Sequence, residues 1–233
     1  MRLAVAFLFL LASFACARPD TLYVNADGAR SAVGVWESAK AKKTAPVAVW
    51  FHGGMTSGNC EKGLVAASDF SSLVPGYTVM SASACHDRHW VTPAAVNWVD
   101  AALDSIAARR HSPVDTVYLI GVSDGALGVI FYSMHGKRRA VARVLVSSFG
   151  GSLGNATAIA RSLSTRGGSW RFVQGGNDRL YPVSMSVPWI EEFCRGVRTG
   201  CDLKYDPAGE HDWSYWRNKR KDWVLEPFLR RNP

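Results

Sequence analysis

Short, uninterrupted apolar segments alternate along this chain with longer segments of helical spacing. The clearest apolar segments are Pro46–Phe51 (PVAVWF) and Thr116–Val122 (TVYLIGV). Strands that are apolar at every position are buried on both faces, which is typical of a mainly parallel sheet covered by helices. The pattern therefore predicts an α/β fold. Further strands are predicted at 77–82, 140–147, 170–174 and 202–205, helices at 92–110, 124–135 and 187–195, and an antiparallel edge pair at 21–25 and 31–36.

The N-terminal segment Met1–Ala17 has the composition of a signal peptide. Arg2 precedes an apolar run over Leu3–Leu11, and Ala15-Cys16-Ala17 fits the small-x-small cleavage pattern. The apolar run is shorter than the roughly 20 residues of a membrane-spanning helix, and no later segment is long and apolar enough. We expect cleavage after Ala17, a secreted or periplasmic protein, and a single domain over 18–233. A retained anchor and lipidation of the cysteine are the alternatives.

The composition suits one well-packed domain with a basic surface. Hydrophobic residues make up 48% of the 233 positions, and 9 Trp, 7 Tyr and 10 Phe can build a core, which excludes a disordered chain. The formal net charge of +8 becomes +7 when Arg2 is removed with the signal segment (8 − 1). This excess indicates either an anionic partner or a solvated basic surface.

Four cysteines remain after removal of the signal segment: Cys60, Cys85, Cys194 and Cys201. An even number in an exported chain indicates two disulfides, although four cysteines allow three pairings. We favour Cys60–Cys85 and Cys194–Cys201. The second pair closes a short loop, and the first would join two loops that each follow a predicted strand.

The segment Gly121-Val122-Ser123-Asp124-Gly125 has the pattern Gly-x-Ser-x-Gly and lies between a predicted strand and a predicted helix. A serine at such a strained turn is exposed as a nucleophile, and the glycines let the backbones of strand and helix approach it. The helix N-terminus adds partial positive charge beside a developing oxyanion. Ser123 is therefore the predicted nucleophile. The alternative is a glycine-rich turn for phosphate binding or packing.

An acid and a base follow Ser123 in the order that this chemistry uses. Asp178 directly follows the predicted strand 170–174, and His211 precedes a predicted helix. The carboxyl ends of strands gather catalytic groups in α/β sheets, and a serine needs a base. The predicted triad is therefore Ser123, Asp178 and His211. Asp202 and Asp206 are rival acids, which we interpret as strand-edge or turn residues because they are so close to His211 in sequence.

His52-Gly53-Gly54 follows the first buried strand and predicts a second donor for an oxyanion. A glycine turn presents its N–H groups without side chains in the way. The candidate donors are therefore the backbone N–H groups of Asp124 and of Gly54 or Met55. We expect His52 to fix the turn by packing.

The loop Cys85-His86-Asp87-Arg88-His89 has a spacing that could bind a metal. A disulfide at Cys85 would remove one ligand and no second cluster completes a site, so we predict no metal. The loop would lie near the active-site edge. His89 and Trp90 are therefore candidate substrate-binding residues. Tyr181 and Trp213, which are near the predicted triad, are candidate pocket walls, although aromatic side chains near such a site more often serve packing.

Four segments together resemble motifs of the α/β-hydrolase superfamily: His52-Gly53-Gly54, Gly121–Gly125, Gly176-Asn177-Asp178 and Gly209-Glu210-His211-Asp212-Trp213. They are most similar to small secreted esterases of the polyhydroxybutyrate depolymerase and feruloyl or acetylxylan esterase type, or to the core of dienelactone hydrolase-like proteins. The resemblance covers roughly 46–221. It implies a mainly parallel central sheet flanked by helices, a Ser–His–Asp esterase, and no metal or organic cofactor.

The resemblance also bears on the substrate. Residues 148–169 leave room for a short lid or none, which favours small or polymeric esters. The same triad could cleave peptides or thioesters or transfer an acyl group to another acceptor. We expect a monomer.

Three basic clusters favour a different kind of partner. They are Lys40–Lys43, Lys137–Arg139 and Arg217–Lys221, the last beside Trp213, Tyr215 and Trp216. A non-catalytic module that binds anionic polymers or surfaces is therefore the alternative function. Solvated helix ends would show the same pattern.

Overall fold

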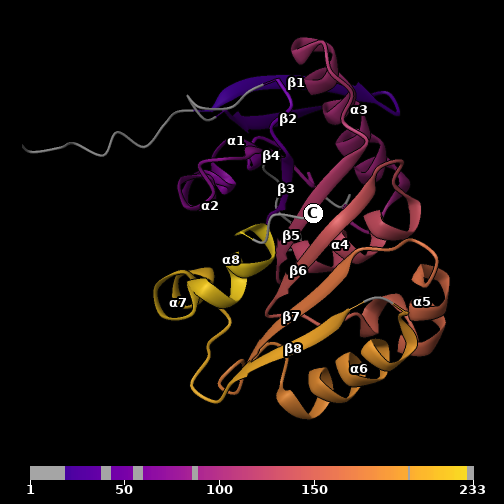
Figure 1. Cartoon of the computed structure of the whole chain (residues 1–233), viewed down its shortest axis with the longest axis vertical. Helices are drawn as coiled ribbons and strands as arrows, with labels where there is room; N and C mark the ends of the chain where they lie inside the picture. Colours follow the sequence, from indigo (N-terminus) through magenta and orange to yellow (C-terminus); the bar gives the residue numbers. More distant parts are fainter. Residues whose placement is uncertain (1–18, 38–42, 55–59, 86–88, 199, 230–233) are drawn as a thin grey trace, which may run out of the picture.

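An eight-stranded sheet is the centre of the protein in the computed structural model, which describes residues 19–37, 43–54, 60–85, 89–198 and 200–229 (Figure 1). The strand order is β1-β2-β4-β3-β5-β6-β7-β8. The strands are β1 Asp20–Ala26, β2 Ala29–Trp36, β3 Val47–Phe51, β4 Thr78–Ala82, β5 Thr116–Val122, β6 Arg139–Val146, β7 Ser169–Gly175 and β8 Cys201–Asp206. From β4 to β8 all neighbours are parallel, and β2 is antiparallel to both β1 and β4. The predicted α/β fold and its antiparallel edge pair are confirmed.

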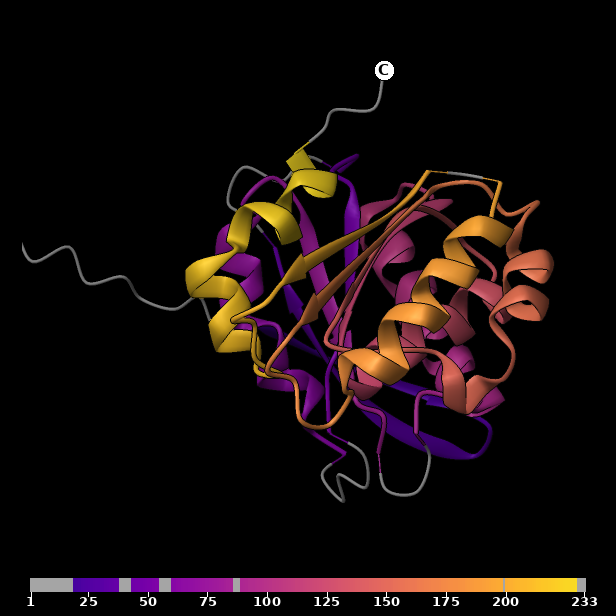
Figure 2. The same cartoon turned by 90° about the horizontal axis from the view of Figure 1, so that it is seen from below.

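Helices cover both faces of this sheet. One face is covered by α3 Pro93–Arg110, α4 Asp124–His135, α5 Ala156–Leu163 and α6 Val183–Gly196, and the other by α2 Ser68–Leu73, α7 Trp213–Lys219 and α8 Lys221–Leu229. Two short elements, α1 Gly63–Ala66 and the 3₁₀ turn η1 Gly151–Leu153, complete the described helices. Figure 2 shows the yellow α7 and α8 on one side of the sheet and the orange α6 on the opposite side.

Strand β3 shows why the apolar segments are uninterrupted. Val47, Val49 and Phe51 pack into the core under α3 and α4, whereas Ala48 and Trp50 pack into the core under α2 and α8. All five side chains are buried. Successive strand residues point to opposite faces, so a strand covered on both faces must be apolar at every position.

Some helices differ from those predicted. Helix α6 begins at Val183, earlier than the predicted 187, and contains Pro188. A proline inside a helix removes one backbone hydrogen bond, and here Ile190 and Phe193 in the buried core hold the helix in place. The helices α1, α2, α5 and α8 were not predicted. They are short, and a short helix depends on tertiary packing more than on its own propensity.

The two favoured disulfides are confirmed. Cys60 is bonded to Cys85 and Cys194 to Cys201. The first bond joins the segments that follow β3 and β4, and the second joins α6 to β8. No helix among the described residues is long and apolar enough to cross a membrane. The predicted signal segment 1–17 lies outside the described residues.

Candidate active site

Ser123 lies at a sharp turn between β5 and α4. Its backbone has φ 56° and ψ −123°, a combination that residues other than glycine rarely adopt. The N–H of Ser123 donates to the Val146 carbonyl (2.9 Å), and its carbonyl accepts from the N–H of Ala126 (2.9 Å). These bonds hold the strained residue in place. The serine hydroxyl is therefore presented at the carboxyl edge of the sheet and at the start of a helix.

Two glycines make this turn possible. A Cβ on Gly121 would lie 2.2 Å from the carbonyl oxygen of Gly125. A Cβ on Gly125 would lie 2.0 Å from the carbonyl oxygen of Phe51 on β3. Neither backbone oxygen can move away without breaking the strand or the helix, so any side chain at these positions would displace the Ser123 turn.

Asp178 lies in the loop after β7 and is almost fully buried. Its Oδ1 accepts from the backbone N–H groups of Leu180 and Tyr181, each at 2.9 Å, and its Oδ2 accepts from the Gln174 amide at 3.3 Å. Burial opposes ionisation. Hydrogen bonds from His211 and from the two N–H groups outweigh it and hold the pKa of Asp178 below its ordinary value. The carboxylate is therefore ionised at neutral pH.

His211 lies between β8 and α7 and contacts this carboxylate. Its Nδ1 is 2.9 Å from Asp178 Oδ2 and 3.0 Å from Oδ1. An ionised carboxylate cannot donate, so Nδ1 carries the hydrogen and Nε2 is the basic nitrogen. The ring is partly exposed, with 19% of the side-chain surface accessible. A histidine paired in this way with an aspartate is the arrangement that activates the serine in Ser–His–Asp hydrolases.

The loops that carry Asp178 and His211 are hydrogen-bonded to each other. Asn177 N–H donates to the Gly209 carbonyl and Gly176 N–H to the Asp206 carbonyl, each at 2.9 Å. A Cβ on Gly175 would lie 2.3 Å from the Gly209 carbonyl oxygen, so a glycine is needed where the two loops cross. The distance between the acid and the base is therefore set by backbone contacts.

His52 fixes the turn after β3, as predicted. Its ring is buried, its Nε2 accepts from the Ala84 N–H (3.0 Å), and its Nδ1 lies 3.1 Å from the Gly53 carbonyl. Burial lowers the pKa of His52 to about 4, so the ring is neutral at physiological pH. The imidazole joins the loop after β3 to the loop after β4, which the Cys60–Cys85 bond also joins.

The turn that carries the predicted oxyanion donor Gly54 approaches Ser123. Gly54 has φ +89°, and a Cβ on its neighbour Gly53 would lie 2.9 Å from the Val122 carbonyl oxygen and 3.4 Å from the Ser123 Cβ. Met55 lies outside the described residues. The ammonium of Lys62 donates to the Gly53 carbonyl at 2.6 Å and braces the same turn. No local sequence pattern connects Lys62 with the glycine turn, so this contact was not predicted.

The four predicted substrate-binding residues have different positions. Trp90 is 2% exposed, and its indole N–H donates to the His52 carbonyl (2.8 Å) while its ring packs on Phe51. This position corrects the prediction for Trp90, because the ring supports the loop and has no surface to offer a substrate. Trp213 packs against Trp50 at a centroid distance of 4.9 Å.

His89 and Tyr181 lie close to predicted site residues. His89 is partly exposed and interacts electrostatically with Asp124. The Tyr181 ring lies 5.5 Å from the His211 ring. Among the described residues, no three His, Cys, Asp or Glu side chains form a group that could hold a metal ion.

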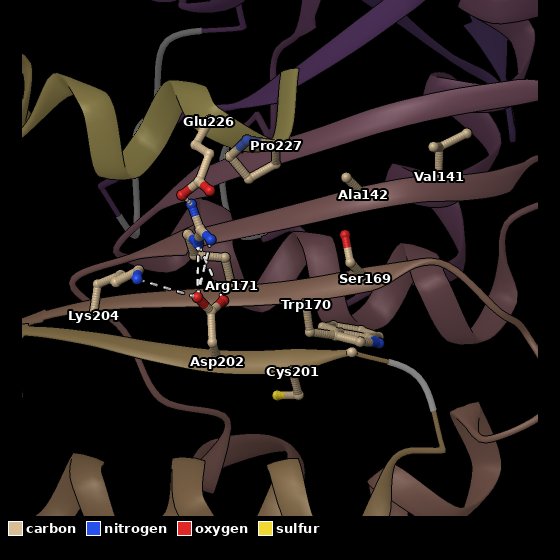
Figure 3. A pocket seen from close by; sticks show the side chains of 11 residues that line it. Val141, Ala142, Ser169, Trp170, Arg171, Cys201, Asp202, Lys204, Glu226 and Pro227 are labelled. Atoms are coloured by element: carbon tan, nitrogen blue, oxygen red, sulfur yellow. Dashed lines mark hydrogen bonds and ion pairs between the residues drawn. The ribbon is translucent and has the colours of Figure 1, made fainter. Parts of the chain in front are cut away.

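A hollow of about 660 Å³ opens beside the acid and the base. It is lined by Gly176, Asn177, Asp178, Arg179, Leu180, Glu210, His211 and Asp212. A second hollow, of about 460 Å³, lies at the opposite end of β7 and β8 (Figure 3).

The rival acids belong to other interactions. Asp202 pairs with Arg171 in the second hollow, at 2.9 Å from Nη2. Asp206 accepts from the Tyr215 hydroxyl (2.9 Å) and pairs with Arg220 (2.7 Å). Each carboxylate has a partner other than His211, which agrees with their interpretation as strand-edge residues.

Comparisons with known proteins show the fold of this chain. No protein-family model and no curated protein matches this chain. Among solved structures, a thermostable esterase matches with a TM-score of 0.62 at 14% identity, over 91% of this chain and 62% of that one. Est1E from Butyrivibrio proteoclasticus matches with a TM-score of 0.63 at 15% identity, over 90% of this chain and 99% of that one. The fold is that of the α/β-hydrolases.

The α/β-hydrolase fold is also present in a much longer neighbour. An acylaminoacyl peptidase from Pyrococcus horikoshii matches with a TM-score of 0.65 at 11% identity, over 91% of this chain and 40% of that one. The chain thus spans less than two thirds of the thermostable esterase and two fifths of the peptidase. Within its own α/β-hydrolase fold, Ser123 follows β5, Asp178 follows β7 and His211 follows β8, all at the carboxyl ends of strands.

Proposed function

We propose that this protein is a serine hydrolase that cleaves carboxylic esters. Ser123 is the nucleophile, His211 the general base and Asp178 the acid that orients it. The observation that carries the proposal is the buried, ionised Asp178 paired with His211 at the same sheet edge as the strained Ser123. Esterases among the structural neighbours support the same reaction class.

The reaction proceeds in two steps. His211 Nε2 takes the hydroxyl proton of Ser123 as Oγ attacks the ester carbonyl carbon, and the carbonyl oxygen becomes an oxyanion held by backbone N–H groups of Asp124 and Gly54. The intermediate collapses, and the leaving alcohol takes the proton from His211. Water then attacks the acyl-enzyme, giving its proton to His211, and the acid is released as that proton returns to Ser123 Oγ.

The hollow beside Asp178 and His211 offers one exposed apolar side chain to an ester. Leu180, which lines this hollow, is 66% exposed. Between β6 and β7, the helix α5 packs against α6 through the core residues Ile159 and Leu163. We propose small or polymeric esters as substrates. The polyhydroxybutyrate depolymerase or feruloyl esterase branch remains a prediction.

The test is the variant Ser123→Ala with Ser162→Ala as its control. Ser162 donates to the Ile159 carbonyl on α5, so both variants lose one hydroxyl. Loss of the nucleophile should lower kcat for p-nitrophenyl acetate on the order of 10⁶-fold and abolish labelling by a fluorophosphonate, while the control keeps both. Unchanged hydrolysis by Ser123→Ala would refute the nucleophile. A preference for peptide or thioester substrates in the same assay would refute the ester assignment.

We also propose that the protein is exported, with Met1–Ala17 removed. The two disulfides support this, because such bonds persist in oxidising compartments. N-terminal sequencing of the protein from its extracellular or periplasmic fraction should begin at Arg18. A protein that retains Met1 would contradict the cleavage.

Attraction to an anionic surface is an auxiliary proposal, and two arginines of the basic clusters already have acidic partners. Arg138 pairs with Asp100 (3.5 Å) and Asp104, and Arg217 pairs with Asp69. Residues 40–42 of the first basic cluster lie outside the described residues. The net charge still predicts salt-dependent retention on a polyanion column, and no retention at low salt would oppose it.

A further inference from the structure

The ammonium group of Lys62 lies against the glycine turn that carries a proposed oxyanion donor. Its Nζ donates to the Gly53 carbonyl at 2.6 Å, and a Cβ on Gly54 would lie 2.6 Å from the same nitrogen. A hydrogen bond from a charged donor is stronger than one from a neutral donor. The ammonium therefore holds this turn from the side of Gly54 on which other residues carry a side chain.

The carbonyl of Gly53 and the N–H of Gly54 belong to one peptide group. This group is planar and trans, so its carbonyl and its N–H point in opposite directions. Lys62 binds the carbonyl end, and the N–H is directed away from the ammonium. Whatever fixes the carbonyl of Gly53 therefore also fixes the direction of the donor at Gly54.

His52 donates to the same carbonyl. Its Nε2 accepts from the Ala84 N–H (3.0 Å), so the neutral ring carries its hydrogen on Nδ1, which lies 3.1 Å from the Gly53 oxygen. The oxygen thus accepts one neutral hydrogen bond and one from a cation. Hydrogen bonds polarise one another along a chain, so the bond to the cation makes the N–H at the other end of the amide a stronger donor.

The backbone around Lys62 is anchored by groups other than the ammonium. Cys60 is bonded to Cys85, and the Gly63 N–H donates to the buried Ser83 hydroxyl at 2.8 Å. These contacts attach the segment to the loop after β4. A substitution that removes only the ammonium leaves them in place.

The charge of Lys62 also acts on Asp124, whose backbone N–H is the other proposed donor. Burial raises the pKa of the Asp124 carboxyl, and the charges of His89 and Lys62 oppose that rise. A carboxylate next to the nucleophile would repel an oxyanion, since both are negative. A cation that acts on Asp124 and on the glycine turn counters this repulsion.

We propose that Lys62 is a positioning residue for the oxyanion donors, whose ammonium orients the Gly53–Gly54 peptide group and strengthens the Gly54 N–H as a donor to the tetrahedral intermediate. This role rests on the proposed function. Lys62 acts through the peptide group, and proton transfer belongs to His211. Because the carbonyl oxygen of the ester gains its negative charge only on the way to the intermediate, the contribution of Lys62 belongs to kcat more than to KM.

The test is Lys62→Met, which keeps the aliphatic chain and removes the ammonium. Loss of a whole oxyanion donor lowers kcat about 10²- to 10³-fold, so weakening one donor should lower kcat for p-nitrophenyl acetate about tenfold, with KM changed less than about twofold. Lys62→Arg keeps the charge and should recover most of the lost kcat. The matched control is Lys204→Met. The Lys204 ammonium pairs with Asp202 (3.7 Å) in the second hollow, and its loss should leave kcat and KM unchanged.

A trifluoromethyl ketone gives a second measurement that general stability does not move. Ser123 Oγ adds to its carbonyl carbon while the hydroxyl proton passes to His211, and the adduct carries a charged oxygen like that of the intermediate. Its inhibition constant should rise about tenfold in Lys62→Met. Urea unfolding checks that each variant is folded, and Lys62→Gln, which keeps a neutral donor, replaces Lys62→Met with the same expected losses where that variant does not fold.

Each outcome supports or overturns the proposal. Equal kcat and equal inhibition constants in Lys62→Met and the parent overturn it. A higher KM at unchanged kcat overturns it in favour of a substrate contact, and an equal loss in Lys204→Met overturns it in favour of a general effect of charge. A loss in Lys62→Arg as large as in Lys62→Met overturns the role of the charge.

The parent protein separates this proposal from the proposed function. If a fluorophosphonate labels the parent at Ser123 but the parent hydrolyses no ester, the ester assignment fails while the inhibition constants still decide the role of Lys62. A parent that is not labelled at Ser123 refutes both proposals.

Discussion

A hollow lined by charged side chains lies at each end of β7 and β8. At the amino ends, a hollow of about 460 Å³ surrounds Arg171, and at the carboxyl ends a hollow of about 660 Å³ adjoins Asp178 and His211. Both are lined by acidic and basic side chains. The two ends differ in how completely their polar side chains find hydrogen-bond or ion-pair partners.

The amino end is fully paired around Arg171. Its guanidinium bonds to Asp202, to Glu226 (2.7 Å) and to the Trp223 carbonyl (3.0 Å), as Figure 3 shows for the two carboxylates. Because Glu226 and Trp223 belong to α8, these bonds attach the last helix to the sheet. This hollow is therefore a stabilising joint.

The carboxyl edge of the sheet also carries the turn after β5, where groups are unsatisfied or strained. Both carboxylate oxygens of Asp124 are buried without a hydrogen bond to another described residue, and burial raises the pKa of this group. Ser123 has a positive φ. Unsatisfied and strained groups cost stability and are retained where they serve chemistry. The comparison therefore separates a structural end of the sheet from the end that we propose is reactive.

The largest expected effect tests the reactive end. Asp178→Asn should lower kcat/KM for p-nitrophenyl acetate about 10⁴-fold, because an amide stabilises the wrong tautomer of His211. The matched change at the structural end is Asp202→Asn, which should leave kcat/KM nearly unchanged. Steady-state kinetics on both folded variants make the measurement. A large loss in Asp202→Asn with little loss in Asp178→Asn would reverse the assignment of the acid.

Removal of either disulfide should have an intermediate effect on stability. Cys60–Cys85 lies at the carboxyl edge of the sheet, and Cys194–Cys201 lies at the amino end of β8. The bonds span 25 and 7 residues, and loop-closure entropy predicts losses of about 3.5 kcal/mol for Cys60→Ser/Cys85→Ser and about 2.4 kcal/mol for Cys194→Ser/Cys201→Ser. Urea unfolding measures both. Because Cys60–Cys85 braces the turn of Gly54, its removal should also lower kcat, whereas removal of the second bond should not. Equal effects on kcat would contradict the division between the two ends.

The smallest effect concerns the joint at Arg171. Asp202 and Glu226 are each partly exposed (41% and 39% for their side chains), so water can solvate them when the guanidinium is removed. Arg171→Met should therefore lower the free energy of unfolding by about 2 kcal/mol and leave kcat/KM unchanged. The exposed Arg179 in the hollow beside Asp178 and His211 offers the control, and Arg179→Met should change stability by less than about 0.5 kcal/mol. A loss of activity without a loss of stability in Arg171→Met would show that this hollow serves catalysis.

The sequence predicted the reactive end better than the details around it. Strand β5 and helix α4 have the predicted bounds, because an uninterrupted apolar run and a Gly-x-Ser-x-Gly turn are local signals. Trp90 shows what such signals lack. Its place after β4 correctly indicated the carboxyl edge of the sheet, but the direction of its ring depends on Phe51 and His52, at the end of another strand.

The amino-acid sequence by itself determined the layered α/β arrangement, the order of Ser123, Asp178 and His211, and the number of disulfides but not their pairing. These features follow from apolar periodicity, glycine positions and cysteine number, which are all properties of short segments or of composition. Tertiary structure decided which side chains meet. Lys62 on the Gly53 carbonyl, the Tyr181 ring beside the His211 ring, and Arg171 between β8 and α8 join residues that are 9, 30 and 55 positions apart. Such contacts arise when parallel strands bring distant loops to one edge, so no single segment could predict them.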